Sequence, residues 1–202
     1  MLKLTSDETP INPYRVIHEL MALVDRRRTI ITHDSGMPRD QLSPFWETLI
    51  PRGYLGWGKS TQLGSSLGFA MGAKLAARDK LVIQFLGDTA FGMCGLDPET
   101  AVRERIPILT ILVNNGLMGG YERWIPIASQ KYRSRYLSGD YAKVAEGLGV
   151  AAQRVTEPGQ IVAALRRALD LVAPGGNPSS PEARPALIEF ITREETTLSK
   201  SW

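Results

Sequence analysis

The sequence predicts an α/β fold: a doubly wound, mostly parallel sheet flanked by helices. Two nearly continuous apolar runs, residues 81–86 and 108–113, have the composition of strands buried on both faces, as in a parallel sheet. Segments with the apolar periodicity of helices alternate with these and other short apolar runs. Such alternation is typical of sheets in which ligands bind beyond the carboxyl ends of the strands.

The amino-terminal part of the chain begins with a polar arm, residues 1–11, and continues with a helix. Asn12 and Pro13 are the residue types of a helix cap and a first helical position. The apolar face of this helix is expected to consist of Val16, Ile17, Leu20, Met21 and Val24. A buried strand is expected at residues 29–32, followed by a loop over 33–39 that Gly36 and Pro38 keep irregular.

The next expected helix covers residues 62–77. Its glycines, Gly64, Gly68 and Gly72, share one face, where another backbone or a ligand can approach closely. Between the two apolar strands we expect a helix of about ten residues that begins near Leu96. Asp140 is expected to cap a helix over 141–148, and the remaining elements are a strand at 152–155, a helix at 161–172, a loop at 174–185 and a strand at 186–191.

The composition favours one domain covering residues 1–202 and excludes several classes of protein. The hydrophobic fraction is 43%, and 24 basic and 21 acidic residues are spread along the chain, so a nucleic-acid surface is not expected. The single cysteine, Cys94, excludes an intrachain disulfide or a four-thiolate metal site. No membrane span or signal pattern is visible, and we expect a cytoplasmic protein.

Polar residues follow two neighbouring strands of the expected sheet. Gly87 and Asp88 follow the first apolar run, and Asn114 and Asn115 follow the second. Asp88 alone would be an ordinary turn or cap residue, but together the two strand ends offer a carboxylate and a carboxamide oxygen. Such oxygen donors suit Mg²⁺, which usually keeps water and phosphate as its other ligands. The helix near Leu96 is expected to direct its N-terminus toward the same crevice, which would favour a bound diphosphate.

Asn115 lies 27 positions after Asp88. Gly-Asp and Asn-Asn pairs at this separation resemble the signature of thiamine diphosphate enzymes. The similarity extends from Pro10 to the closing strand and is to the carboxyl-terminal, diphosphate-binding domain of the decarboxylase and acetolactate synthase superfamily. It implies the thiamine diphosphate-binding fold, with Mg²⁺ held by Asp88, Asn115 and the backbone carbonyl of Leu117. The cofactor-binding residues that it implies are Ser35, Gly36, Ser65, Ser66, Leu67, Gly87, Asp88, Thr89, Ala90, Asn115, Leu117 and Met118.

The sequence after Asp88 departs from the commonest pattern of that superfamily. Thr89 and Ala90 stand where many members have Gly-Ser, so a Cβ lies close to the expected diphosphate and a hydroxyl is lost at position 90. The run Gly-Asp-Thr-Ala-Phe-Gly is similar to that of oxalyl-CoA decarboxylase and 2-hydroxyacyl-CoA lyase. We therefore expect the chain to be closest to this coenzyme A branch.

Other residues have a functional and a structural interpretation. The resemblance implies that Leu67 lies beneath the bend of the cofactor and that the Ser65 carbonyl accepts from its 4′-amino group, but Leu67 also suits a helix core. His33 and Glu122 are the weaker candidates for a catalytic role; for His33 a structural, hydrogen-bonded histidine is the favoured interpretation. Cys94 is expected to pack as a small buried residue.

The superfamily's chemistry also requires a glutamate on the pyrimidine ring of the cofactor, which a separate pyrimidine-binding domain supplies. We therefore expect either one subunit of a split enzyme, with two copies of each chain, or a truncated piece of a longer one. The expected reaction makes or breaks a C–C bond next to a carbonyl of a 2-oxo acid or an acyl-CoA. The alternatives are a non-catalytic cofactor-binding or regulatory module and, less favoured because no G-x-G-x-x-G follows an early strand, an NAD-binding domain.

Overall fold

The structure, a computed structural model, describes residues 2–58, 60 and 62–196. In this part of the chain six strands form one sheet in the order β2-β1-β3-β4-β6-β5. Every neighbouring pair is parallel. The strands are β1 (Thr29–His33), β2 (Tyr54–Leu55), β3 (Leu81–Gly87), β4 (Leu109–Asn114), β5 (Ala151–Val155) and β6 (Ala186–Ile191). The predicted parallel α/β sheet is confirmed.

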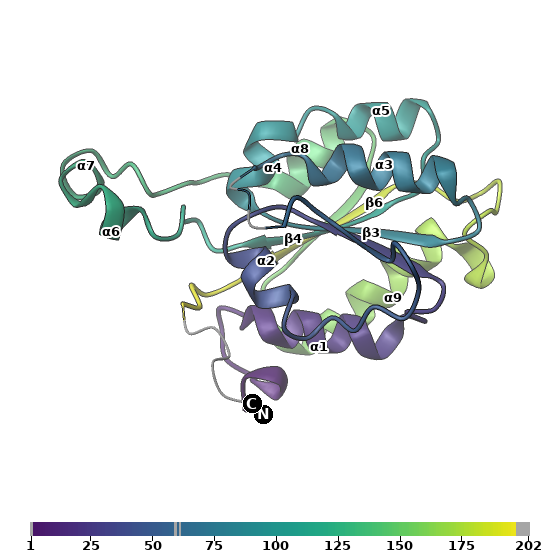
Figure 1. The fold of residues 1–202 in the computed structure, drawn as a ribbon, viewed down its shortest axis with the longest axis horizontal. Helices are drawn as coiled ribbons and strands as arrows, with labels where there is room; N and C mark the ends of the chain where they lie inside the picture. Colours follow the sequence, from purple (N-terminus) through teal and green to yellow (C-terminus); the bar gives the residue numbers. More distant parts are fainter. Residues whose placement is uncertain (1, 59, 61, 197–202) are drawn as a thin grey trace.

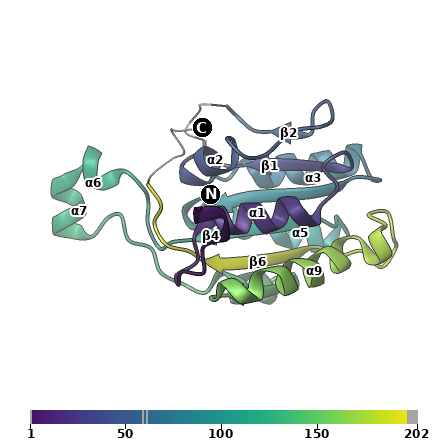
Figure 2. The ribbon, with the colours of Figure 1, turned by 90° about the horizontal axis from the view of Figure 1, so that it is seen from below.

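Helices cover both faces of the sheet (Figure 1). One layer contains α1 (Pro13–Leu23), α2 (Met37–Leu42) and α9 (Ile161–Val172), and the other contains α3 (Ser66–Ala76), α4 (Asp88–Cys94), α5 (Pro98–Arg103) and α8 (Tyr141–Gly147). Short 3-10 turns lie at Leu2–Thr5, Pro158–Gln160 and Pro174–Gly176. Two further helices, α6 (Tyr121–Trp124) and α7 (Pro126–Tyr132), stand away from both layers (Figures 1 and 2). None of the described helices is long and apolar enough to cross a membrane.

Alternate residues of the central strands belong to two separate hydrophobic cores. Ile83 and Phe85 of β3 lie in the core beneath α1 and α9, whereas Val82 and Leu86 lie in the core beneath α3 and α4. All four side chains are completely buried. Burial of one such side chain stabilises the fold by about 1.5 to 3 kcal/mol, so packing on both faces explains the largely apolar composition of β3.

Both predicted helix caps are present. The Asn12 side chain accepts from the Tyr14 backbone N–H at 3.0 Å, and α1 starts at Pro13. The Asp140 side chain accepts from the Lys143 N–H at 3.1 Å and caps α8. Residues 1–11 do not remain polar to their end, because Ile11 is fully buried and forms a β-bridge with Thr192.

Three predicted segments differ in the structure. The helix expected over 62–77 begins only at Ser66, because Gly64 has a positive φ of 83° that the α-helix does not allow. A Cβ at Gly68 or Gly72 would meet nothing within 4 Å, whereas a Cβ at Gly64 would lie 3.8 Å from the Ala90 carbonyl oxygen, so the expected close approach is found at Gly64 alone among these three glycines. The loop expected over 33–39 contains the start of α2, with Pro38 in its first turn.

The helix expected from Leu96 is the third difference: a helix does begin close by, at Pro98, but it has 6 residues and is not the helix that begins at the crevice. Two shorter helices occupy the region: α4 follows β3 directly at Asp88, and α5 starts at Pro98. Gly95 is the C-cap of α4, and Pro98 suits the first position of α5, where its missing N–H costs nothing. The helix that begins at the crevice is therefore α4, and Asp88 is its first residue.

Candidate functional site

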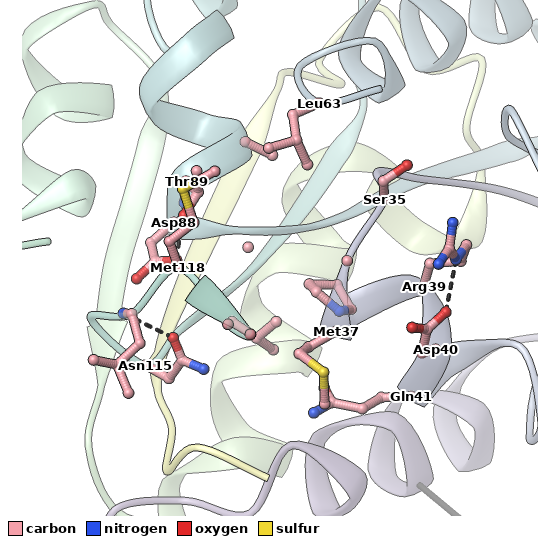
Figure 3. A pocket seen from close by; sticks show the side chains of 18 of the residues that line it. Ser35, Met37, Arg39, Asp40, Gln41, Leu63, Asp88, Thr89, Asn115 and Met118 are labelled. Atoms are coloured by element: carbon pink, nitrogen blue, oxygen red, sulfur yellow. Dashed lines mark hydrogen bonds and ion pairs between the residues drawn. The ribbon is translucent and has the colours of Figure 1, made fainter. Parts of the chain in front are cut away.

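A cavity of about 590 Å³ lies beyond the carboxyl ends of the central strands. Residues that follow β1, β3, β4 and β6 all reach it, so it occupies the edge of the sheet where parallel α/β folds bind ligands. Figure 3 shows the side chains that line it. The lining residues are Pro13, Ser35, Gly36, Met37, Pro38, Arg39, Asp40, Gln41, Leu63, Gly87, Asp88, Thr89, Ala90, Val113, Asn115, Leu117, Met118, Gly119, Gly120, Tyr121, Trp124, Ile125, Thr192 and Arg193.

Asp88 is a buried carboxylate on the wall of this cavity, only 3% exposed. Its two oxygens accept from the backbone N–H groups of Thr89 and Gly116, both at 2.8 Å. Burial raises the pKa of Asp88, and these N–H donors oppose that rise. No ion pair among the described residues includes Asp88, so its negative charge has no basic side chain as a partner.

The loop after β4 brings Asn115 and Leu117 to the same wall. The Asn115 carboxamide oxygen accepts from the Leu117 N–H at 3.0 Å. Gly116, between them, has a φ of 69°, a conformation that glycine adopts without strain. The Gly116 carbonyl accepts from the Leu137 N–H at 2.9 Å, so the segment that follows α7 also holds this loop.

Most of the other cofactor-binding residues expected from the sequence also line the cavity. They are Ser35, Gly36, Gly87, Thr89, Ala90 and Met118. Gly36 precedes α2 with a φ of 85°, which turns the chain from β1 into the cavity wall. A Cβ at Gly87 would lie 3.2 Å from the Pro38 side chain, so a glycine here lets α2 pack closely against the end of β3.

Ser65, Ser66 and Leu67 are not among the lining residues. The Asp34 carboxylate accepts from the N–H groups of Ser65 and Ser66 at 3.0 and 3.2 Å and from the Ser66 hydroxyl, and it thereby caps α3. The Ser65 carbonyl accepts from the Phe69 N–H within α3. Leu67 is 2% exposed and belongs to the core on that side of the sheet, in the same cluster as Ala90.

Neither candidate catalytic residue lines the cavity. His33 is buried against the Tyr54 ring, with ring centroids 4.8 Å apart, and burial lowers its pKa. The structure thus gives His33 the surroundings of a structural histidine. Glu122 lies on α6 and forms an ion pair with Arg135 at 3.0 Å. Cys94 is buried, and burial raises the pKa of its thiol to about 12.

Sequence reasoning missed the wall opposite Asp88. There α2 supplies Met37, Arg39 and Gln41 (Figure 3). The Arg39 guanidinium pairs with Asp40 at 2.7 Å and donates to the carbonyls of Gly58 and Ser60. The signal that could have found α2 was Pro38, because proline is as typical of a first helical turn as of a loop. The contribution of Trp124 and Ile125 to the wall was also missed.

The donors at this site fit a hard divalent cation better than a transition metal. No group of three or more His, Cys, Asp and Glu side chains that could hold a metal lies within the described ranges. Asp88 and Asn115 instead offer one carboxylate and one amide oxygen beside a cavity that has room for a phosphate-bearing molecule. Such a set leaves most positions of an octahedral Mg²⁺ to water and to the ligand.

Comparisons with known proteins agree with this arrangement. Residues 34–190 match the family described as thiamine pyrophosphate enzyme, C-terminal TPP binding domain; thiamine pyrophosphate is another name for thiamine diphosphate. A probable acetolactate synthase large subunit of Methanococcus aeolicus is 31% identical over 83% of this chain and 29% of its own length. A mitochondrial acetolactate synthase catalytic subunit of Aspergillus candidus is 30% identical over 90% and 25%, respectively.

A 2-hydroxyacyl-CoA lyase of Oryza sativa subsp. japonica is 27% identical over 81% of this chain and 30% of its own length. The chain thus spans between 25% and 30% of the length of these three relatives. The family match covers most of the chain and includes Asp88, Asn115 and the whole loop between them. The chain therefore belongs to the C-terminal TPP binding domain family of thiamine pyrophosphate enzymes.

Proposed function

We propose that this chain binds Mg²⁺ and the diphosphate of thiamine diphosphate in the cavity at the carboxyl ends of β1, β3 and β4. The observation that carries the proposal is the Asp88 carboxylate, which is 3% exposed, borders the cavity and has no basic partner among the described residues. A buried charge of this kind is expected to be compensated, and a metal diphosphate supplies the compensating cation.

In this proposal Asp88, Asn115 and the Leu117 carbonyl hold the metal. The remaining cavity residues from the same strand ends, Ser35, Gly36, Gly87, Thr89, Ala90 and Met118, surround the cofactor. Ser65, Ser66 and Leu67 do not line the cavity. We propose that they support the cavity wall, since Leu67 packs in the same core cluster as Ala90, which does line it. When bound, thiamine diphosphate supplies a nucleophilic carbon and accepts the electrons of the broken C–C bond.

We further propose that the chain works with a pyrimidine-binding domain carried by a partner chain, with two copies of each. The carboxylates that line the cavity in the described ranges are Asp40 and Asp88, and Asp40 is already paired with Arg39. No glutamate lines it there, so the glutamate that the pyrimidine ring requires is expected from the partner. Met93 on α4 and Leu96 just after it are 60% and 74% exposed and offer an apolar surface for this contact.

The reaction that we propose makes or breaks a C–C bond next to a carbonyl, as a 2-hydroxyacyl-CoA lyase or a 2-oxo acid decarboxylase or carboligase. Similarity to acetolactate synthase subunits and to a 2-hydroxyacyl-CoA lyase supports this reaction class. The residues Thr89 and Ala90 after Asp88 favour the coenzyme A branch.

The metal site is tested by calorimetric titration of thiamine diphosphate with Mg²⁺ into the wild type, Asp88→Ala and Asp97→Ala. Asp97 is the matched control, because it lies nine positions further on and is exposed. Asp88→Ala should abolish measurable binding, since it removes the charged ligand, and Asp97→Ala should leave it unchanged. Unchanged affinity in Asp88→Ala would contradict the assignment.

Catalysis is tested by adding a candidate pyrimidine-binding partner to the purified chain and assaying a panel of 2-oxo acids and 2-hydroxyacyl-CoA thioesters. We expect turnover only in the mixture. Cofactor binding without turnover in any mixture would favour the non-catalytic or regulatory module. Robust turnover by the chain alone would mean that a residue of its own, with Glu122 the first suspect, replaces the expected glutamate.

A further inference from the structure

Glu189 is a fully buried carboxylate in the middle of β6, a strand that is otherwise apolar. One of its oxygens accepts from the Asn114 side-chain amide at 2.7 Å and from Arg154 at 2.9 Å. The other accepts from Arg154 at 3.0 Å and from the Ala142 N–H, at the start of α8, at 2.9 Å. Glu189 therefore connects three neighbouring strands, β4, β5 and β6, with a helix.

These contacts continue to the proposed metal site. The Asn114 carboxamide oxygen accepts from the Gly116 N–H at 2.9 Å, and the same N–H donates to Asp88 at 2.8 Å. Asn115 lies between Asn114 and Gly116, so its backbone is held on both sides. A continuous series of hydrogen bonds therefore runs from Arg154 through Glu189 and Asn114 to the carboxylate of Asp88.

The ionised form of Glu189 determines which way the Asn114 amide faces. A carboxylate only accepts hydrogen bonds, so it requires the NH₂ group of Asn114 on its side. The carboxamide oxygen of Asn114 must then face the Gly116 N–H, as observed. A neutral amide in place of Glu189 could either donate or accept, and the Asn114 orientation would no longer be imposed.

We propose that Glu189 is a positioning residue that holds residues 114–117 in the geometry that binds the divalent cation, so that its carboxylate contributes to metal affinity from behind the site. This inference rests on the proposed Mg²⁺ site and adds a residue that touches neither the metal nor the cofactor. The pair with Arg154 supports it. The Glu189 end of this pair is fully buried whereas the Arg154 side chain is 33% exposed, so Arg154 compensates the buried charge from the edge strand while Glu189 orients the Asn114 amide.

The test is calorimetric titration of Mg²⁺ into the full chain in the presence of thiamine diphosphate, for the wild type and Glu189→Gln. Glu189→Gln keeps the shape of the side chain and removes its charge. Direct partners of metal ligands typically contribute about 10- to 100-fold in affinity; because Glu189 acts through Asn114, we expect a loss at the lower end, about tenfold weaker Mg²⁺ binding. If Glu189→Gln does not fold, Asn114→Ala decides the question with the same expected loss.

Two controls separate positioning from general destabilisation. Glu19→Gln makes the same chemical change in the partly buried Arg15–Glu19 ion pair of α1. Leu20→Ala creates a cavity at a fully buried position in the core beneath α1 and α9, on the face of the sheet opposite α8. Both should bind Mg²⁺ within about twofold of the wild type, since both residues lie on α1, in the helix layer opposite the one that contains α8 (Figure 1).

The outcomes are distinguishable. Wild-type affinity in Glu189→Gln or, if that variant is unfolded, in Asn114→Ala would overturn the inference and leave the proposed function intact. An equal loss in Leu20→Ala would overturn it too, because affinity would then follow the stability of the whole fold. A wild-type chain that does not bind Mg²⁺ with thiamine diphosphate would overturn the proposed function and this inference together.

Discussion

Leu67 allows the interior of the fold to be tested apart from any ligand. Its side chain is 2% exposed and lies in the core beneath α3 and α4. Leu67→Ala removes three buried carbon atoms, worth about 2 kcal/mol at roughly 0.8 kcal/mol each. The cavity left behind raises the expected loss in the free energy of unfolding to about 3 kcal/mol. In a domain of this size, such a loss lowers Tm by about 6 to 12 °C.

The assay is urea unfolding of the cofactor-free chain, followed by circular dichroism, with Leu75→Ala as the matched control. Leu75 lies two turns further along α3 and is 53% exposed, so its truncation should change stability by less than about 0.5 kcal/mol. A loss below about 1 kcal/mol in Leu67→Ala would refute the core placement. In the reconstituted complex, hydrogen–deuterium exchange at the cofactor C2 carbon tests whether Leu67 supports the cofactor from the cavity wall. We expect slower exchange in Leu67→Ala; exchange at the wild-type rate would exclude this role.

Two further predictions concern buried titratable groups outside the cavity. The Lys74 ammonium donates to the carbonyls of Arg78, Lys80 and Pro178, and burial lowers its pKa from 10.5 to about 8. Between these two values the unfolded chain binds more protons than the folded one, so stability should rise with pH across that window in the wild type and not in Lys74→Met. Parallel pH profiles of the unfolding free energy would contradict this assignment. The Cys94 thiol, whose pKa burial raises to about 12, should react with a thiol reagent only after unfolding; rapid labelling of the native chain would show that it is accessible.

The sheet and the central residues of the site could be predicted because their signals are local and strong. Residues 81–86 and 108–113 are apolar except for Gln84 and Thr110, and a strand buried on both faces explains such a composition. Asp88 and Asn115 follow these strands directly, so the topology alone brings them to one edge of the sheet. The structure places both on the same cavity wall.

The rest of the cavity depends on backbone conformations that composition does not reveal. Leu63 reaches the cavity because the chain turns at Gly64, whose φ is 83°, before α3 starts. The wall made by α2 was hidden by Pro38, which suits both a loop and a first helical turn. Residues 119–125 show no apolar periodicity that would have indicated the short helix α6.

Glu189 did carry a signal in the sequence. A single charged residue within the apolar run of β6 must be buried, and a buried charge needs partners. What the sequence could not show is that those partners are Arg154 on β5 and Asn114 on β4, since the pairing follows from the order of the strands.

The most direct test of the account is the Mg²⁺ dependence of thiamine diphosphate binding by the wild-type chain. Calorimetry with Mg²⁺ and with excess EDTA compares the two states of one protein, without any substitution. The account predicts saturable binding to one site with Mg²⁺ and its loss in EDTA, because the diphosphate and the buried Asp88 carboxylate repel each other without a cation between them. Equal affinity in EDTA would contradict the account, as would the absence of binding in both conditions.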